Sequence, residues 1–160
     1  MIEERVRRSA RVLLVDPADR ILLFSVTDDG ATRWFAPGGG LVDGETYPEA
    51  AARELWEETG LTVDPADLGP EVWHGRPWAS VREGVPYRNF QHYFLLRAPA
   101  FEIDTSRFEA LERAAIDGHR WWTVPQLRST TDCLRPAGLP DLLSDLLSGG
   151  APAQPVLVSG

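Results

Sequence analysis

Three glutamates are spaced so that one helix face would carry them all. Glu54, Glu57 and Glu58 stand at positions i, i+3 and i+4. With about 100° of rotation per residue, a helix holds them within an arc of about 100°. Like charges at these spacings destabilise a helix by about 0.2–0.5 kcal/mol per pair, so a divalent cation would relieve the repulsion. Carboxylate oxygens are hard ligands, which favours Mg²⁺, with Mn²⁺ as the alternative, over Zn²⁺.

The helix that would carry these carboxylates has its own start and stop signals. Thr46 and Glu49 have the spacing of a capping box, Pro48 suits a first turn, and Gly60 suits a left-handed cap. These signals predict a helix over Tyr47–Thr59. The same rotation predicts a core face made of Ala51, Ala52, Leu55, Trp56 and Thr59.

A glycine-rich loop precedes the helix. Gly38, Gly39 and Gly40 follow Pro37, and residues without a side chain let the backbone approach a ligand closely. Mg²⁺ keeps several waters and tends to bind substrate phosphates. The loop and the carboxylate face together therefore predict phosphate chemistry.

Gly39, Glu45 and the run from Arg53 to Leu61 resemble the Nudix box at every specified position. A glutamate-rich helix alone is often only a solvated surface, but nine fixed positions within 23 residues, from Gly39 to Leu61, favour the box. The resemblance implies a Nudix-type α/β/α sandwich with a mixed central β-sheet, in which the box forms a loop, a helix and a loop. We expect one Nudix hydrolase domain over residues 1–148 and a Gly/Pro/Ala-rich tail over residues 149–160.

The resemblance also implies an activity. It is the Mg²⁺-dependent cleavage, by direct attack of water on phosphorus, of the diphosphate linkage in a nucleoside diphosphate derivative such as ADP-ribose or a nucleotide sugar. Glu54, Glu57 and Glu58 would hold the metal, and the general base would be Glu54, Glu58 or a residue outside the box. Two alternatives stay open: a nucleoside triphosphate pyrophosphatase that removes oxidised or surplus nucleotides, and a nucleotide sensor without turnover. Such sensors commonly lose a box residue, and this chain has lost none.

Further residues are assigned roles around that centre. Arg53 would orient the carboxylates, and Glu45 would brace the loop or contact the metal through water. Gly38, Gly39 and Gly40 would bind substrate, Trp34 would stack on a nucleobase, and Glu112 would supply an additional acid. Four other aromatic residues can also stack on a base, although each is more typical of a core: Trp73, Trp78, Phe90 and Tyr93. The three histidines show no metal-ligand spacing and are expected to be structural: His74, His92 and His119.

Composition limits the class of protein. A chain of 160 residues with 43% hydrophobic residues fits one domain, and its formal charge of −8 argues against a nucleic-acid partner. The expected partner is a small-molecule nucleotide, and a homodimer is left open. Cys133 is the single cysteine, which excludes an intramolecular disulfide, and the apolar run after the first arginines is too short to span a membrane. These features favour a cytoplasmic protein with no membrane partner.

The remaining elements are predicted from hydrophobic pattern and turn residues. Residues 11–15 and 21–26 predict a hairpin, residues 27–32 a polar loop, residues 61–63 an extended segment, and residues 71–78 and 89–98 paired strands. Residues 119–124 predict a strand with Trp121 and Trp122 on opposite faces, and residues 125–127 and 140–147 predict short helices. The tail should be mobile unless residues 156–158 dock onto a sheet edge.

Overall fold

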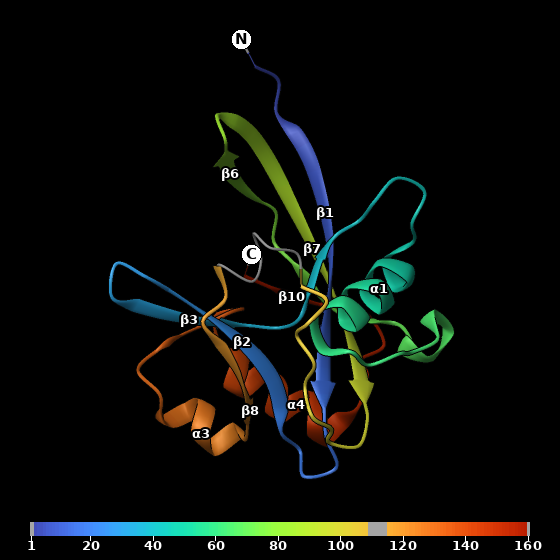
Figure 1. Ribbon diagram of the computed structural model, residues 1–160. Coiled ribbons are helices and arrows are strands. Elements are labelled where there is room, and N and C mark those ends of the chain that lie inside the picture. The colour runs from blue at the N-terminus through green and yellow to red at the C-terminus, as the bar shows by residue number, and fades with distance from the viewer. Residues whose placement is uncertain (1, 109–114, 160) are drawn as a thin grey trace.

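The computed structural model of the chain describes residues 2–108 and 115–159 (Figure 1). The strands among these residues are β1 (Arg5–Val15), β2 (Ile21–Asp28), β3 (Ala31–Phe35), β4 (Gly38–Gly40), β5 (Glu71–Gly75), β6 (Trp78–Arg82), β7 (Val85–Arg97), β8 (Gly118–Trp122), β9 (Cys133–Leu134) and β10 (Val156–Val158). The helices are α1 (Tyr47–Thr59), α3 (Val124–Ser129) and α4 (Leu139–Gly149), with a 3₁₀ turn, η1 (Pro65–Leu68).

The strands form one mixed sheet whose two halves diverge. Its main path runs β10-β5-β7-β1-β2-β3-β9, with β4 beside β1, β6 beside β7 and β8 beside β2. β1 and β7 pair in parallel along the whole of β1, whereas β1 meets β2 only at the Val15–Ile21 pair. Away from that pair, the edge of β1 is taken by the glycine strand β4. Figure 1 shows β2 and β3 turning away from β1 and β7, and the glycine strand lies in the opening.

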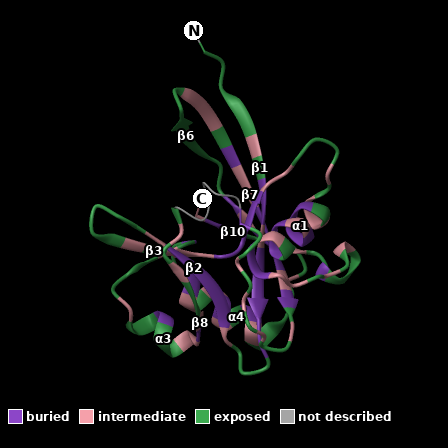
Figure 2. Ribbon diagram, viewed as in Figure 1, coloured by how far each residue is buried: buried purple, intermediate pink, exposed green. Residues whose placement is uncertain are grey.

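Helices cover both faces of the sheet, because alternate residues of β1 point to opposite sides. Leu13 and Val15 belong to a core that α4 covers, and Val12 and Leu14 belong to a core that α1 covers. Figure 2 shows the buried residues concentrated along β1, β2 and β7. This is the α/β/α arrangement with a mixed sheet that the resemblance implies.

Helix α1 has the predicted bounds and the predicted caps. The Thr46 hydroxyl accepts from the Glu49 amide, and the Glu49 carboxylate accepts from the Thr46 amide, so the capping box is complete. Gly60 ends the helix with φ 81°, a left-handed conformation that glycine adopts without steric cost. The predicted core face is correct except at Trp56, which is 42% exposed. The Arg107 guanidinium lies 4.6 Å above its ring, so Trp56 meets a cation at the surface instead of the core.

The turn between β1 and β2 is organised by Asp16. Its buried carboxylate accepts hydrogen bonds from the Arg20 amide (2.8 Å) and Arg20 Nε (2.7 Å), and from the Ala18 amide (3.0 Å). Burial raises the pKa of Asp16, but the hydrogen bonds from Arg20 outweigh it and hold the pKa below its usual value. The predicted turn is therefore confirmed, but the two strands that it joins pair only at Val15 and Ile21 and then diverge.

Two predictions on the second half of the chain are also confirmed. Trp122 lies in the core under α4, while Trp121 packs against the core under α1, so the two rings occupy opposite faces of β8. α3 and α4 form where short helices were predicted, each one or two residues longer than predicted at its ends.

Three expectations were wrong. Residues 27–32 are not a loop: β2 and β3 continue into a tight hairpin, since Asp29 and Gly30 both adopt positive φ, the conformation of a two-residue reversal. Gly38–Gly40, predicted as a loop, form the short strand β4 paired with β1. The single strand predicted over residues 71–78 is broken after Gly75, where Pro77 lacks the N–H that a sheet ladder needs, and β6 starts at Trp78. Residues 61–63 have no assigned secondary structure, and Leu61 and Val63 pack against the core under α1.

Residues 156–158 of the C-terminal tail dock onto a sheet edge, which was the condition for the tail not to be mobile. β10 pairs in parallel with β5 at the sheet edge, and Val158 is buried in the core under α4. The domain boundary at residue 148 stays a prediction. No helix in residues 2–108 or 115–159 is long and apolar enough to cross a membrane.

Candidate active site

Helix α1 places Glu54 and Glu58 against the glycine strand β4, and all three of its carboxylates line one cavity. Glu54 and Glu58 are each only 5% exposed, and the Glu57 side chain is 25% exposed. Buried carboxylates are costly unless they are compensated. One compensation comes from β4, where the Gly38 amide donates to Glu58 Oε2 over 2.9 Å. The helix and the strand thus hold the carboxylates at fixed positions.

Glycine is required in β4 because the strand is squeezed between α1 and β1. A Cβ atom on Gly39 would lie 2.5 Å from Glu54 Oε1. A Cβ on Gly38, whose φ is 148°, would collide with the Ala10 carbonyl oxygen of β1. The glycines therefore let the backbone contact the Glu54 carboxylate directly, as close approach requires.

Arg53 connects the loop to the helix through several hydrogen bonds. Its Nε and Nη2 donate to the two oxygens of Glu45 at 2.7 and 2.9 Å, a bidentate pair. Nη1 donates to Glu54 Oε1 at 2.9 Å and to Glu57 Oε2 at 3.4 Å, and Nη2 also reaches the Gly40 carbonyl at 3.0 Å. A planar guanidinium can make this set of contacts and an ammonium cannot. Arg53 therefore fixes the orientation of three carboxylates and the end of β4.

The Glu45–Arg53 pair is strong enough to shift the ionisation of both groups. The hydrogen bond from Arg53 holds the pKa of Glu45 below its usual value, against partial burial, and the Val42 amide adds a further donor. The carboxylates of Glu45 and Glu54 in turn raise the pKa of Arg53. Glu45 thus braces the loop, which is one of the two roles considered for it.

A cavity of about 850 Å³ opens between the carboxylates and a wall of arginines. Every cationic residue of the chain other than histidine is an arginine, 16 in all. Among the residues that the structure describes, six arginines line this cavity in an otherwise acidic molecule: Arg5, Arg7, Arg8, Arg11, Arg53 and Arg82.

The arginine wall concentrates positive charge, although Arg53 is paired with carboxylates. Burial lowers the pKa of Arg7, and the nearby guanidinium groups of Arg82 and Arg11 lower it further, while the Glu54 carboxylate acts in the opposite direction. Cations that repel one another at the wall of a cavity favour an anionic ligand. Arginine is also the side chain that binds phosphate oxygens in bidentate fashion. The cavity therefore combines a carboxylate wall suited to a cation with an arginine wall suited to phosphate groups.

The carboxylate wall fits a divalent ion of the Mg²⁺ or Mn²⁺ type. Glu54, Glu57 and Glu58 all line the cavity and offer only hard oxygen ligands. The Glu57 side chain is partly exposed and lines the cavity, so an ion in the cavity can reach it. We infer that an ion placed here would lie between the carboxylates and a phosphate-bearing ligand.

The structure brings most of the predicted site residues together. Gly38, Gly39 and Gly40 line the cavity with Arg53 and the three glutamates of the helix. Trp34 lies elsewhere: it borders a separate hollow with Trp122, and its Nε1 donates to Asp132. Its role as a base-stacking residue stays a prediction. Glu112 lies outside the described residues, so its predicted role stays untested too.

The arginine wall is what the sequence reasoning missed. Arg5, Arg7 and Arg11 are separated by even numbers of residues in β1, so their side chains lie on the same face of the strand. That spacing could have been read from the sequence. Their meeting with Arg82 could not, because it depends on the β6–β7 hairpin, in which Val81 and Arg82 pair with Pro86 and Val85.

Residues 5–141 match the family model described as NUDIX domain. The chain belongs to this family. The expected Nudix hydrolase fold is confirmed by solved structures that share it at low sequence identity. A MutT protein from Methanosarcina mazei aligns with a TM-score of 0.58 at 18% identity, covering 92% of this chain and 97% of that one. A bifunctional NMN adenylyltransferase/ADP ribose pyrophosphatase from Francisella tularensis, solved with AMP and a Mn ion, has a TM-score of 0.58 at 18% identity and covers 94% of this chain and 43% of that one.

Curated Nudix relatives are similar over part of their length. An RNA pyrophosphohydrolase from Erythrobacter litoralis is 33% identical over 112 residues, which are 62% of this chain and 66% of that protein. The phosphatase NudJ from Escherichia coli is 44% identical over 52 residues, which are 32% of this chain and 34% of that protein. The chain thus spans less than two thirds of the length of these two relatives.

Proposed function

We propose that this Nudix chain is a Mg²⁺-dependent hydrolase that cleaves a diphosphate linkage in a nucleotide derivative. The observation that carries the proposal is the single cavity in which Glu54, Glu57 and Glu58 share the lining with the arginine wall. Its volume of about 850 Å³ is within the range of sites that bind small molecules. An arginine wall alone would bind phosphate without cleaving it. The carboxylates would supply the metal ligands and the general base that hydrolysis requires.

Each group has a proposed task. Glu54, Glu57 and Glu58 would hold Mg²⁺, or Mn²⁺ as an alternative, and such an ion when bound neutralises phosphate charge and lowers the pKa of water. Arg53 keeps Glu54 and Glu57 oriented by the hydrogen bonds described above. Glu54 or Glu58 would accept the proton as water adds to phosphorus, and the phosphorus–oxygen bond to the leaving phosphate breaks. The arginines of the wall would hold the phosphate oxygens in line for this displacement.

The favoured substrate class is a nucleoside diphosphate derivative such as ADP-ribose or a nucleotide sugar. The glycines of β4 would contact its phosphates, and the base or sugar would extend along the cavity toward Phe35 and Tyr87. The expected cytoplasmic location remains a prediction, and a homodimer remains open. A nucleoside triphosphate pyrophosphatase would use the same residues, and a sensor without turnover is disfavoured by the complete box.

A second substrate class has independent support. Relatives named RNA pyrophosphohydrolase are similar over much of the chain. The six arginines in one cavity provide local positive charge in spite of the formal charge of −8. Removal of pyrophosphate from a 5′-triphosphorylated RNA end is therefore the second candidate, and it would overturn the expectation that no nucleic acid is bound.

The test is a substrate panel with separated products. ADP-ribose, nucleotide sugars, nucleoside triphosphates, oxidised nucleotides, dinucleoside polyphosphates and a 5′-triphosphorylated oligoribonucleotide are incubated with the chain and Mg²⁺, and the products are resolved by chromatography. We expect Mg²⁺-dependent cleavage of a diphosphate linkage, abolished by a chelator and restored by Mn²⁺. Absence of turnover on every substrate, together with nucleotide binding, would favour the sensor.

Two substitutions test the proposed carboxylate roles. Glu57→Gln and Glu58→Gln each remove a charged ligand while keeping the side-chain volume, and we expect turnover to fall by at least about 100-fold, because the loss of even an outer partner of a metal site costs about 10–100-fold. The matched control is Glu102→Gln, an exposed position outside the cavity, whose activity should equal that of the wild type. Near wild-type turnover in both box variants would refute the assignment.

A further inference from the structure

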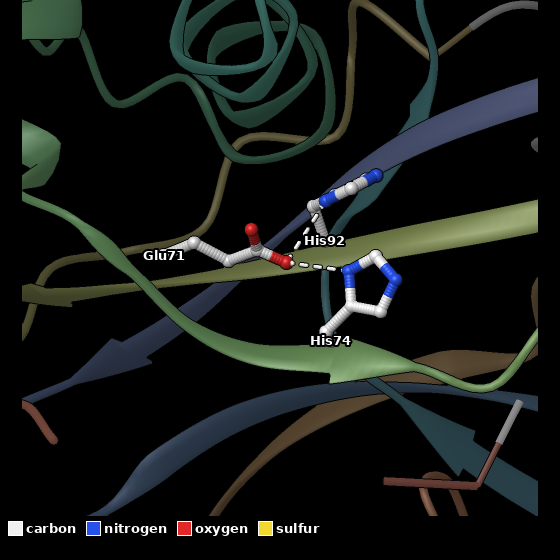
Figure 3. Close-up of side chains that lie close together, drawn as sticks. All are labelled: Glu71, His74 and His92. Carbon is white, nitrogen blue, oxygen red and sulfur yellow. Dashed lines mark hydrogen bonds and ion pairs between the residues drawn. The ribbon is translucent and has the colours of Figure 1, made fainter. Parts of the chain in front are cut away.

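A second group of ligand-type side chains lies outside the proposed active site. Glu71 Oε1 is 2.8 Å from His92 Nδ1 and 3.0 Å from His74 Nδ1. Figure 3 shows both imidazole rings turned to the same carboxylate oxygen. One ligand atom from each of the three residues falls within 4.8 Å of the others. We call these three residues the His–Glu cluster, and none of them lines the cavity of the proposed active site.

Strand pairing explains how the cluster forms. His74 of β5 and His92 of β7 are directly opposite each other in the antiparallel ladder, so their side chains share a face. Glu71 is three residues before His74, and in a regular strand these two would point to opposite faces. An irregularity of the β-bulge type between Glu71 and Trp73 shifts the register, and Glu71 joins the histidines.

The cluster is held firmly on one side and open on the other. The His92 side chain is 11% exposed, and its ring packs on the Tyr47 ring with centroids 3.8 Å apart. Tyr47 is the first residue of α1. The Glu71 and His74 side chains are 23% and 36% exposed, so an ion can reach them from solvent. A fixed ligand beside two ligands with freedom to move is a workable arrangement for a metal site.

We propose that Glu71, His74 and His92 bind a transition-metal ion of the Zn²⁺ type, separately from the carboxylates of α1. Two imidazoles and one carboxylate are a ligand set that Zn²⁺ accepts, with water at the fourth position. Imidazole nitrogen favours Zn²⁺ and its neighbours among the transition metals, whereas Mg²⁺ prefers all-oxygen sites. The two sites of the chain are therefore distinguished by ligand chemistry.

The geometry requires only a small adjustment. Ligands about 2.0–2.1 Å from a tetrahedral Zn²⁺ are about 3.4 Å apart, while the Oε1–Nδ1 separations are now 2.8 and 3.0 Å. The ligands must move apart by about 0.5 Å, which rotation of the partly exposed Glu71 and His74 side chains can supply. The metal would replace the two hydrogen bonds in which the Nδ1–H groups donate to Glu71. Each neutral ring must then carry its proton on Nε2 instead of Nδ1, so that the Nδ1 lone pair is free to bind.

Metal binding at this place would join three elements. Glu71 and His74 belong to β5, His92 belongs to β7, and Tyr47 on the His92 ring begins α1. An ion that binds only the folded chain stabilises it in proportion to the logarithm of its concentration. Zn²⁺ should therefore raise the melting temperature of the chain without any contribution from the Nudix-box glutamates.

The experiment is a titration of the full chain, without a polyhistidine tag, with ZnCl₂ in millimolar Mg²⁺. Calorimetry measures stoichiometry and affinity, and thermal melting measures the stabilisation. The variants are His74→Gln and Glu71→Gln, both at partly exposed positions, with His119→Gln as the matched control because His119 is an exposed histidine outside the cluster. Glu57→Gln tests whether the box glutamates hold the ion.

We expect one Zn²⁺ per chain for the wild type, His119→Gln and Glu57→Gln. Binding should weaken by more than about tenfold in His74→Gln and Glu71→Gln, since loss of even an outer partner of a metal site costs at least that much. Their metal-free melting curves report whether each variant is folded. Absence of Zn²⁺ binding by the wild type would overturn the proposal, as would binding lost in Glu57→Gln and retained in His74→Gln.

Discussion

Individual side chains in the proposed active site are held by contacts that leave little freedom. Arg53 donates to Glu45, Glu54 and Glu57 and to the Gly40 carbonyl, so its guanidinium joins the loop before α1 to the carboxylate face. Gly39 stands against the Glu54 carboxylate, where no Cβ atom has room. At this scale the site depends on one arginine that orients acids and one glycine that makes space for them.

The space at Gly39 can be tested by adding one carbon atom. In Gly39→Ala the new Cβ would lie 2.5 Å from Glu54 Oε1, so either the carboxylate or β4 must move. A displacement of about 1 Å at a catalytic group can cost about 100-fold in rate, and we expect a loss of that size in steady-state turnover. Gly118→Ala is the control, because a Cβ there meets only Ser25 Oγ at 3.9 Å. Equal activity in both variants would contradict the close contact.

The Glu45–Arg53 pair predicts a dependence of stability on pH. Because the pKa of Glu45 is lower in the folded chain than its ordinary value of 4.5, the pair stabilises the fold fully above about pH 4.5 and loses this contribution as the pH falls through the lowered pKa. Denaturant unfolding of the wild type and Glu45→Gln should therefore differ most at neutral pH and converge in acid. A difference that grows as the pH falls would show that the sign is wrong.

At the scale of the element, α1 shows how local signals place the chemistry. Thr46 and Gly60 bound the helix, and the bounds set which turns carry the glutamates. The glycine strand depends on a different kind of interaction, since it exists only through its pairing with β1 at Ser9, Ala10 and Arg11. The bounds of α1 are therefore set by residues close together in the sequence, whereas β4 forms only because it pairs with a strand that is far away in the sequence.

Removal of the α1 cap should destabilise the chain with little effect on the site. Thr46→Ala deletes the hydroxyl that accepts from the Glu49 amide, and loss of an N-cap typically costs about 1 kcal/mol. For a chain of this size that corresponds to a fall of about 2–4 °C in melting temperature. The exposed Thr131→Ala is the control, with no expected change. If Thr46→Ala melted with the wild type, the cap would contribute nothing to stability.

The molecule as a whole separates its charges. Its formal charge is −8, yet among the described residues six arginines line one cavity together with four glutamates. The gathering depends on the divergence of the two sheet halves, which places β1, β4 and α1 around a common opening. Net charge therefore describes the average surface and gives the wrong sign for the arginine wall.

Mg²⁺ should stabilise the whole fold. An ion that binds the carboxylates of α1 only in the folded chain adds about 1.4 kcal/mol at tenfold its dissociation constant, so the melting temperature should rise with millimolar Mg²⁺ or Mn²⁺. A control melting curve in NaCl at the same ionic strength distinguishes binding of the divalent ion from screening of the carboxylate charges. The rise should shrink in Glu57→Gln. A melting curve that both divalent ions leave unchanged would count against a site formed before substrate binds.

The sequence by itself determined the features that depend on neighbours along the chain. The bounds of α1, its capping box, the left-handed Gly60 and the common face of Glu54, Glu57 and Glu58 follow from contacts three or four residues apart. The family and reaction class follow from the same stretch, because the Nudix box is contiguous.

Only the tertiary structure decided which distant residues meet. The contact of Gly39 with Glu54, the approach of Arg82 to Arg7, and the surface position of Trp56 under Arg107 all depend on how strands and loops pack. The His–Glu cluster depends on strand register and on a single bulge, and a shift of one residue in β5 would send its side chains to the other face. Helical neighbours are fixed by the geometry of one turn, whereas cross-strand neighbours are fixed by pairing between segments far apart in the chain, which no local pattern specifies.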